Sequence, residues 1–454
     1  MIKSSLIIIG AGPGGYRAAQ YAAQNGLTVV IIEAQEAGGT CLNRGCIPTK
    51  TLCRNAEIAD ALKHADVFGV NVVSSGIDFA RVMERKRQVV DQLRSGVETI
   101  MQEPGITFVH GSACFKDSKT VVVGSEEYTA DNIIIATGSS SKFPPVEGTT
   151  LAGVVTSTEL LEIDCLPPRL CIIGAGVIGM EFASVFSSFG CKVTVVEFLK
   201  ECLPMLDSDI AKRLRQTIGK RGVEFAMQSA VKSIQESLTE DGSRQLAVNY
   251  EKKGKAMVAY ADMVLIATGR KPNTDGLGLE LAGVEYTPKG IITDDDFQTN
   301  VEGVYAIGDV NGRCMLAHAA TFQSLHVVNK IIGRSDNIDF EIMPSAIFTY
   351  PEAASVGLSE DRMKAENAVY ECRKGFYRAN GKALAMNETD GMIKLLVNPD
   401  DDNRIIGCHA FGAHSSDIVQ EVAALMNRRA TVGQLADIIH IHPTLSEIIH
   451  DMAL

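Results

Sequence analysis

Two cysteines, Cys41 and Cys46, stand close together in the segment GGTCLNRGCIPTK. In a regular helix this spacing would place their Cα atoms about 8.6 Å apart, beyond the roughly 7 Å limit for a disulfide bond. We therefore expect a distorted segment, with Gly45 supplying backbone freedom and Pro48 occupying an early helical turn. A helix N-terminus there would favour a reactive thiolate. The pair predicts redox chemistry; the alternatives are half of a zinc site or two inert cysteines.

Near the C-terminus, the segment HIHPTLSEIIHD contains a histidine and a glutamate of interest, His442 and Glu447. A carboxylate that holds one ring nitrogen orients the imidazole and stabilises the imidazolium, which makes the histidine a good base toward thiols. Without context such residues are usually surface or helix-end residues, and we keep that interpretation for His440 and His450.

A nucleotide-binding pattern must position such chemistry, and the chain has it twice. The first copy is a strand, SLIIIG, a glycine turn, a helix over residues 16–25 and a second strand, LTVVIIE. Glycines allow the tight turn, the close approach of a pyrophosphate and helix–strand packing, and the terminal glutamate is placed to accept hydrogen bonds from a ribose. The residues are Gly10, Gly12, Gly14, Gly15 and Glu33.

The second copy follows LCIIG and ends in CKVTVVE. Its residues are Gly174, Gly176, Gly179 and Glu197, and the first glycine and the glutamate are separated as in the first copy. One such motif alone could be a plain turn between strand and helix. The repeated spacing predicts binding of two adenine dinucleotides.

Two further segments echo each other, NIIIATG and MVLIATG, and each suits the closing strand of a nucleotide-binding unit. They contribute Thr137, Gly138 and Gly269 to the expected cofactor sites. A third strand, VYAIGD, ends at Asp309, placed to hold a dinucleotide's sugar–phosphate linker, although a turn or N-cap role is the plain alternative.

The neighbourhood of each glutamate assigns the cofactors. The cysteine pair follows Glu33, so the first site should hold a flavin, as FAD. Glu197 is followed by Phe198, Leu199 and Lys200, without an arginine to meet a 2′-phosphate, so NAD is preferred to NADP.

Composition limits the remaining classes. The 454 residues carry a net charge of −12, which disfavours nucleic acid and anionic membranes as partners. The eleven cysteines are not spaced like a secreted disulfide framework, and the cysteine pair lacks a companion Cys/His pair, so no metal is expected. Without an apolar run of membrane length or a targeting segment, we expect no membrane association and a cytoplasmic location.

Together these motifs resemble the flavin-dependent pyridine nucleotide-disulfide oxidoreductases, class I. The likeness covers nearly the whole chain, including GRKPNTDGLGLELAGV, YPEAASVGLSE and HPTLSE. It implies that Cys41 meets the substrate and Cys46 contacts the flavin, while Lys50 lies near the reactive flavin nitrogen, paired with Glu181. It also implies an obligate homodimer in which His442 and Glu447 serve the partner's cysteines.

Within the family, the sequence is similar to the branch that oxidises dihydrolipoyl groups with NAD. Glu197 argues against NADP-linked glutathione-type reductases, HPTLSE against mercuric reductases, and the cysteine pair against soluble transhydrogenase. The resemblance implies a lipoyl-bearing carrier protein supplied in trans, within 2-oxoacid dehydrogenase or glycine cleavage complexes. Two departures stand out: AATFQSL (319–325) replaces an acidic pair and a glycine, and Arg44 replaces a valine.

The expected architecture is α/β, with two doubly wound dinucleotide-binding domains and an α+β C-terminal dimerisation domain. We assign residues 1–148 and 271–340 to the FAD side, 149–270 to the NAD domain and 341–454 to the interface domain. The expected reaction is ping-pong. The alternatives are a related reductase acting on another small disulfide, and a flavoprotein subunit that serves chiefly in binding.

Overall fold

The structure, a computed structural model, describes residues 2–74 and 76–454. The chain divides into two compact units that each gather three stretches of sequence. Unit 1 comprises Met1–Thr51, Ala80–Lys142 and Gly269–Ile338; unit 2 comprises Leu52–Phe79, Phe143–Thr268 and Asp339–Leu454.

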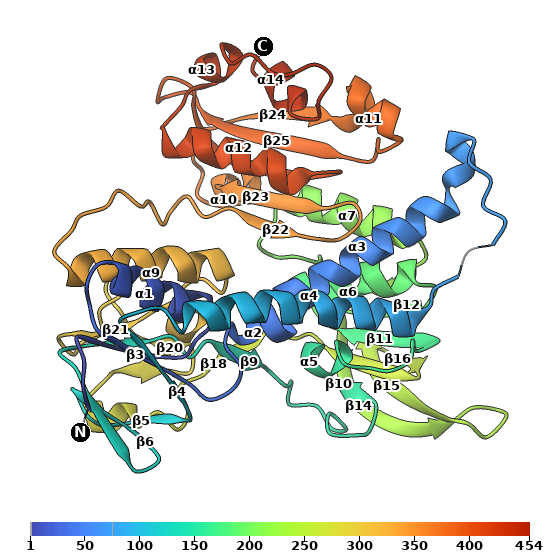
Figure 1. The fold of residues 1–454 in the computed structure, drawn as a ribbon. Helices are drawn as coiled ribbons and strands as arrows, with labels where there is room; N and C mark the ends of the chain where they lie inside the picture. The colour runs from blue at the N-terminus through green and yellow to red at the C-terminus, as the bar shows by residue number, and fades with distance from the viewer. Residues whose placement is uncertain (1, 75) are drawn as a thin grey trace. The chain divides into compact units, whose positions relative to one another are not determined.

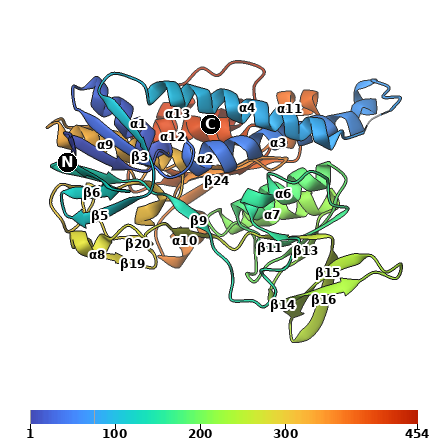
Figure 2. The same ribbon diagram turned by 60° about the horizontal axis from the view of Figure 1, so that its bottom comes forward.

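Unit 1 is built on a five-stranded parallel sheet in the order β21, β8, β2, β3, β4. Strands β2, β3 and β8 are runs of Leu, Val and Ile, and parallel strands of this kind are buried on both faces; Ile7 and Ile8 are fully buried. Helices α1 and α9 lie side by side against it (Figures 1 and 2). The bounds are β2 Leu6–Ile9, β3 Val29–Glu33, β4 Ile106–His110, β8 Asn132–Ile135, β21 Val304–Ala306, α1 Pro13–Gln24 and α9 Ala317–Ile331.

Shorter elements complete unit 1. A second sheet has the order β1, β7, β6, β5, and β9 pairs antiparallel with β18. The bounds are β1 Ile2–Lys3, β5 Ala113–Asp117, β6 Thr120–Val123, β7 Glu126–Thr129, β9 Ser139–Ser141, β18 Arg270–Pro272, α2 Gly39–Arg44, α8 Leu279–Ala282 and η2 Gly308–Asn311. Helices α3 (Cys46–Lys63) and α4 (Phe79–Ile100) have residues in both units.

Unit 2 contains a second five-stranded parallel sheet, in the order β10, β17, β11, β12, β13, followed by an antiparallel sheet β14, β15, β16. The glycine turn after β11 leads into α6, as the turn after β2 leads into α1. The bounds are β10 Val154–Val155, β11 Arg169–Ile173, β12 Lys192–Val196, β13 Glu224–Ala226, β14 Ser229–Leu238, β15 Arg244–Lys252, β16 Lys255–Ala261, β17 Met263–Ile266, α5 Ser157–Leu160, α6 Val177–Ser188 and α7 Ser208–Lys220.

The last part of unit 2 is an antiparallel sheet in the order β22, β23, β26, β25, β24, with α12 packed against β23 and β26 (Figure 1). Its core includes Tyr377, Leu395 and Val422, all fully buried. The bounds are β22 Ser345–Ile347, β23 Ala353–Gly357, β24 Glu371–Phe376, β25 Met392–Asn398, β26 Arg404–Phe411, α10 Glu360–Ala365, α11 Gly381–Met386, α12 Ser415–Asn427, α13 Val432–Ala436 and α14 Glu447–Asp451.

The predicted fold class is confirmed: two doubly wound α/β sheets precede an α+β C-terminal part. The predicted domain boundaries stay a prediction. Among the described residues, no helix combines the length and the apolar character needed to cross a membrane.

Candidate active site

The cysteine segment is broken where the sequence predicts distortion. Cys41 lies within α2, and Cys46 is the first residue of α3. Between the two helices, Gly45 has φ −144° and ψ −107°, which is not helical. A Cβ there would lie 2.9 Å from the Thr40 carbonyl oxygen, too close for any side chain. The break brings the cysteine side chains into hydrogen-bonding contact with each other.

The chemical state of the pair follows from its surroundings. The contact with Cys46 and then burial raise the pKa of Cys41, while the charge of Lys50 lowers it. Cys46 stands at the N-terminus of an 18-residue helix, where the helix dipole favours a thiolate.

The cysteine loop is held by Asn43 and packed on the first glycine turn. The buried Asn43 amide donates to the carbonyls of Ala37 (2.9 Å) and Gly39 (3.0 Å) and accepts from Arg94 Nε at 2.7 Å. A Cβ on Gly39 would lie 2.7 Å from Gly12 Cα. Because this gap admits only glycine, the cysteines are fixed relative to the turn.

The first glycine turn has the geometry of an anion site. Gly10 has φ +103°, and a Cβ on Gly15 would lie 1.8 Å from the Gly10 carbonyl oxygen. No side chain of the described residues caps α1, and its first turn has no acidic residue, so its first amides remain available to an anion. Glu33 accepts from the backbone amides of Ala11 (2.7 Å) and Gln35 (2.8 Å). The carboxylate thus braces the turn, and its further lone pairs can accept ribose hydroxyls.

The second turn repeats this arrangement. Gly174 has φ +107°, and a Cβ on Gly179 would lie 2.0 Å from the Gly174 carbonyl oxygen. A Cβ on Gly176 would meet open space, and no described side chain caps α6. Glu197 accepts from the amides of Ala175 (2.6 Å) and Leu199 (2.7 Å). Both turns therefore fit the pyrophosphate and ribose of a dinucleotide.

Near Asp309, the segments that follow the two closing strands pair with each other as β9 and β18. Thr137 donates to the Asn273 carbonyl at 2.7 Å, and Gly138 and Gly269 have φ +70° and +110°. Asp309 lies in η2, where its carboxylate accepts from Ser139 Oγ and stands 3.9 Å from Arg270 Nε. Its side chain therefore faces polar partners rather than capping a helix.

The departure at 319–325 lies in α9. Gln323 is buried and accepts from the Gly308 amide (2.7 Å) and from Asn311 Nδ2 (3.1 Å). Ala320 is the close neighbour of Gly14 and Gly308. In this chain a neutral amide thus anchors η2, the segment that contains Asp309. Sequence reasoning did not select Gln323, Ser139 or Arg270, although the paired ATG segments already mark the neighbourhood of the latter two.

The predicted contact between His442 and Glu447 forms. His442 Nδ1 lies 2.8 Å from Glu447 Oε1, and Glu447 Oε2 accepts from the Thr444 amide at 2.7 Å. These contacts, the backbone one first, lower the pKa of Glu447. With Nδ1 directed at a carboxylate, Nε2 is the ring nitrogen free to take a proton. The His442 side chain is 82% exposed, so that nitrogen is accessible.

His440 differs from the surface role expected for it. Its side chain is 6% exposed and contacts Glu421 Oε1 and the Ile438 carbonyl, each at 2.9 Å. His450 Nε2 contacts the Ala436 carbonyl at 3.2 Å. Both histidines therefore hold the segment that leads to His442.

Lys50 and Glu181 lie on different helices, α3 and α6. Lys50 lies on α3 and acts electrostatically on Cys41. Glu181 is buried in α6 and accepts from the Phe348 amide at 2.9 Å. Their pairing stays a prediction.

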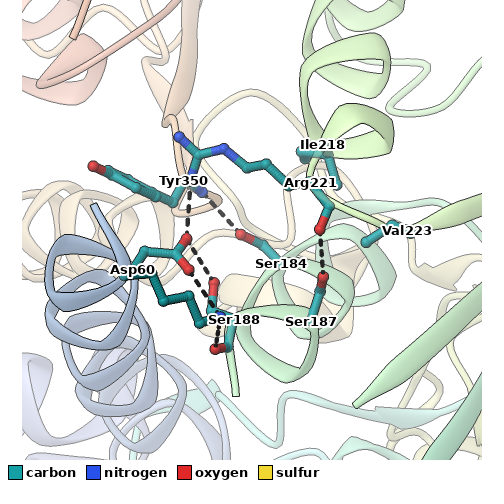
Figure 3. A pocket seen from close by; sticks show the side chains of 9 residues that line it. Asp60, Ser184, Ser187, Ser188, Ile218, Arg221, Val223 and Tyr350 are labelled. Atoms are coloured by element: carbon teal, nitrogen blue, oxygen red, sulfur yellow. Dashed lines mark hydrogen bonds and ion pairs between the residues drawn. The ribbon is translucent and has the colours of Figure 1, made fainter. Parts of the chain in front are cut away.

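A polar pocket in unit 2 contains none of the predicted site residues (Figure 3). Arg221 stacks on Tyr350 at 4.1 Å and pairs with Asp60 at 3.1 Å. Ser188 Oγ donates to Asp60 at 3.0 Å, and Ser184 Oγ accepts from the Tyr350 amide at 3.0 Å. These polar groups are hydrogen-bonded or paired with one another. We therefore interpret the pocket as a structural contact between helices rather than as an active site.

Comparison with known proteins establishes the family. Residues 4–324 match the model of the pyridine nucleotide-disulphide oxidoreductases, and residues 343–453 match the dimerisation domain of the same family. The chain belongs to this family, and its C-terminal part is a dimerisation domain.

Similar proteins narrow the class. The chain is 38% identical over 455 residues to a dihydrolipoyl dehydrogenase of Chlamydia muridarum (strain MoPn / Nigg), covering 99% of this chain and 96% of that protein. It is 36% identical over 459 residues to a dihydrolipoyl dehydrogenase of Bacillus subtilis (strain 168), covering 99% and 98%. A solved structure, the Cu(II) complex of the HOCl-induced flavoprotein disulfide reductase RclA from Escherichia coli, matches with TM-score 0.88 at 30% identity, covering 100% and 99%.

These findings confirm the predicted resemblance to dihydrolipoyl dehydrogenases and the oxidoreductase class. The cofactors of this family are FAD and NAD, as the two glycine turns predict. The role of each site residue stays a prediction.

Proposed function

We propose that this protein oxidises dihydrolipoyl groups on a separate carrier protein to lipoyl groups and reduces NAD⁺ to NADH, using Cys41 and Cys46. The observation that supports this most directly is the contact of the two thiols across the helix break, on a loop packed against a dinucleotide-binding turn. Relatives that match over nearly the full length of both chains, and are named dihydrolipoyl dehydrogenase, support the substrate class.

The chain's own residues perform the thiol chemistry. His442 Nε2 takes a proton from a substrate thiol, and the thiolate attacks Cys41 of the Cys41–Cys46 disulfide, releasing Cys46 as a thiolate. The second substrate thiol then attacks the substrate sulfur of this mixed disulfide, and its proton goes to the departing Cys41 sulfur. The substrate leaves as a disulfide, having given two electrons and two protons. A bound flavin supplies the two-electron redox chemistry that links the cysteine pair to NAD⁺.

Other residues hold the cofactors. We assign Gly10, Gly12, Gly14, Gly15 and Glu33 to FAD, together with Lys50, Thr137, Gly138 and Asp309. We assign Gly174, Gly176, Gly179, Glu181, Glu197 and Gly269 to the NAD side. The open space beside Gly176, the contact of a Cβ on Gly12 with backbone alone (Gly39 Cα at 4.0 Å) and the uncapped starts of α1 and α6 support these assignments.

A turnover assay tests the substrate. Purified protein with dihydrolipoamide and NAD⁺ should form NADH, whereas glutathione disulfide with NADPH should give little turnover. Absence of NADH formation by a flavin-loaded protein contradicts the proposal and favours a role in binding only.

A second candidate is reduction of another small disulfide with NADH, which the likeness to RclA favours. It predicts that NADH oxidation by such a disulfide exceeds NADH oxidation by lipoamide. Measuring both acceptors on one preparation decides between the two.

The dimeric site has its own test. We propose that His442 and Glu447 of one chain serve Cys41 of the other within a homodimer, and the match to a dimerisation domain supports this. Cys41→Ser and His442→Ala proteins, each inactive, should regain activity when mixed under conditions that exchange subunits. Removing the base should cost roughly 10²–10⁴-fold in the dithiol half-reaction. Proven subunit exchange without regained activity contradicts the shared site.

The cytoplasmic location also stays a prediction.

A further inference from the structure

A buried ion pair joins helix α7 to the sheet of the dimerisation domain. Asp207 is the N-cap of α7, and Lys394 lies on β25. Both side chains are 1% exposed, and Lys394 Nζ lies 2.7 Å from Asp207 Oδ1. Desolvation of two buried charges offsets much of their attraction, and apolar residues of similar volume often stabilise a fold as well. Stability alone therefore does not account for the pair, and its further contacts indicate what it does.

Asp207 also contacts α10 and β26. Its Oδ2 accepts from the amide of Glu360, the first residue of α10, at 3.1 Å. The amide of Asp207 donates to Nδ1 of His409 on β26 at 3.1 Å, so this ring nitrogen carries no proton. Lys394 also pairs with Glu360, and Lys394 and His409 are direct neighbours across β25 and β26. Both the side chain and the backbone of Asp207 are thus held at one place on the sheet.

The protonation states around Asp207 agree with these contacts. Burial raises the pKa of Glu360, but the hydrogen bonds of Lys364 and Lys394 lower it to about 2. Burial lowers the pKa of His409 to about 4. At neutral pH Glu360 is therefore ionised and the His409 ring is neutral, as its contact with the Asp207 amide requires.

Asp207 directly follows the segment that borders the second glycine turn. This segment, residues 198–206, begins after Glu197, whose carboxylate braces the turn. In its middle, the amide of Leu203 donates to the carbonyl of Ala175, within the turn, at 3.0 Å. Leu203 is fully buried and has φ +49°, a conformation that a leucine keeps only where its surroundings hold it. The path of the segment therefore depends on where its two ends are fixed.

We propose that Asp207, Lys394 and His409 are positioning residues for NAD: they fix the end of segment 198–206, so that the second glycine turn keeps the shape that fits the dinucleotide. The inference rests on the proposed assignment of this turn to NAD. It gives the dimerisation domain a second task, which is to shape the nucleotide site of its own chain.

The test measures binding of ADP-ribose to flavin-loaded protein by calorimetry. ADP-ribose is the part of NAD that a glycine turn and its glutamate hold, and it undergoes no electron transfer. Lys394→Met keeps an unbranched side chain but leaves the Asp207 carboxylate buried without its cation, which should displace the end of the segment. ADP-ribose should bind about tenfold more weakly, as for the loss of one hydrogen bond to a charged group. The amides of residues 199–206 should exchange hydrogen faster.

A double variant separates positioning from stability. Asp207→Leu with Lys394→Met removes both charges, so the free energy of unfolding should recover most of what Lys394→Met alone loses. ADP-ribose binding should nevertheless stay weak, because leucine cannot accept from the Glu360 amide. If binding recovers together with the free energy of unfolding, the pair has a structural role only and the inference is overturned.

Lys374→Met is the matched control. Lys374 is the neighbour of Lys394 on β24, its side chain is 41% exposed, and its Nζ stands 4.0 Å from Asp209. Because this lysine does not contact Asp207 in the described structure, its loss should leave ADP-ribose binding unchanged. A loss of binding equal to that of Lys394→Met would contradict the inference.

His409 decides the matter if Lys394→Met does not fold. His409→Asn keeps an acceptor for the Asp207 amide, whereas His409→Leu does not. His409→Leu should therefore bind ADP-ribose about threefold more weakly than His409→Asn, and equal binding overturns the inference. Failure of the unaltered protein to bind ADP-ribose contradicts the assignment of the turn to NAD and the inference with it. That failure is seen before any variant is compared, so the two are distinguishable.

Discussion

The two glycine turns have the same backbone conformation, but the residues that pack against them differ. Gly12 has φ −71° and ψ −174°, and Gly176 has φ −76° and ψ −173°. A Cβ on Gly14, however, would lie 3.1 Å from Ile307, which precedes η2, and 3.3 Å from Ala320 of α9, which packs on α1. The matching residue of the second turn is Ile178, which keeps a full side chain. The first turn is thus enclosed by other residues of its unit, whereas the second turn has room for a large side chain.

The segments after the two glutamates differ in the same sense. Residues following Glu33 are tied back, because Arg44 Nη1 donates to Gln35 at 2.7 Å and pairs with Glu36. Phe198 and Leu199, after Glu197, are 73% and 44% exposed. An enclosed site suits a cofactor that stays bound, and an open one suits a substrate that exchanges. We infer from this comparison that the residues packed around each turn, rather than the glycine motif itself, distinguish a site for a bound cofactor from a site for an exchanging substrate.

The largest effect is expected where the turns are most alike. Gly15→Ala and Gly179→Ala each place a Cβ about 2 Å from a carbonyl oxygen and should force helix from strand. Gly15→Ala should yield protein without flavin. Gly179→Ala should stay yellow but lose NADH formation by about a hundredfold, as for a misplaced substrate. The ratio of flavin to protein absorbance and the NADH rate are measured on both; equal flavin loss would contradict the division of sites.

Exchanging the residues at the one position where the turns differ, Gly14 and Ile178, should give the next largest effect, on the free energy of unfolding. Gly14→Ile overfills the contact of α1 with α9 and should lower the free energy of unfolding by about 1–3 kcal/mol. Ile178→Gly should cost only about 0.5–1 kcal/mol, the helix penalty of glycine. Urea unfolding of both proteins, with bound flavin monitored, measures this. Equal costs would show that the two turns are equally enclosed.

Nucleotide choice should respond to the open turn alone. Glu197→Ala with Phe198→Arg replaces a carboxylate facing ribose hydroxyls by a cation facing a 2′-phosphate, and should raise the NADP-to-NAD ratio of kcat/KM at least about tenfold. Glu197 also accepts two backbone amides, so Glu197→Gln is the control for loss of the charge alone. Equal use of NAD and NADP by the unaltered protein would contradict the assignment.

Arg44→Val should have the smallest effect. Its partners are partly exposed, so the free energy of unfolding should fall by at most about 1 kcal/mol. Turnover with dihydrolipoamide should change less than with Gly15→Ala or Gly179→Ala. A loss of flavin in this variant would show that the tie, rather than α9, encloses the first turn.

The sequence predicts what depends on local spacing. The two glycine turns, the break at Gly45 and the His442–Glu447 pair each lie within a short segment, where backbone geometry limits the outcome. The contact of Ser139, Arg270 and Asp309 joins residues far apart in the chain, so no local pattern reveals it. The contact of His440 with Glu421 of α12 likewise joins two separate segments.

The contact of Gly39 with Gly12 has a consequence for variation. A side chain at residue 39 would meet the backbone of residue 12, not another side chain, so no substitution at 12 can make room for it. At this contact the redox loop and the nucleotide turn are therefore not separately adjustable modules: a side chain at residue 39 can be accepted only if the backbone of the turn moves with it.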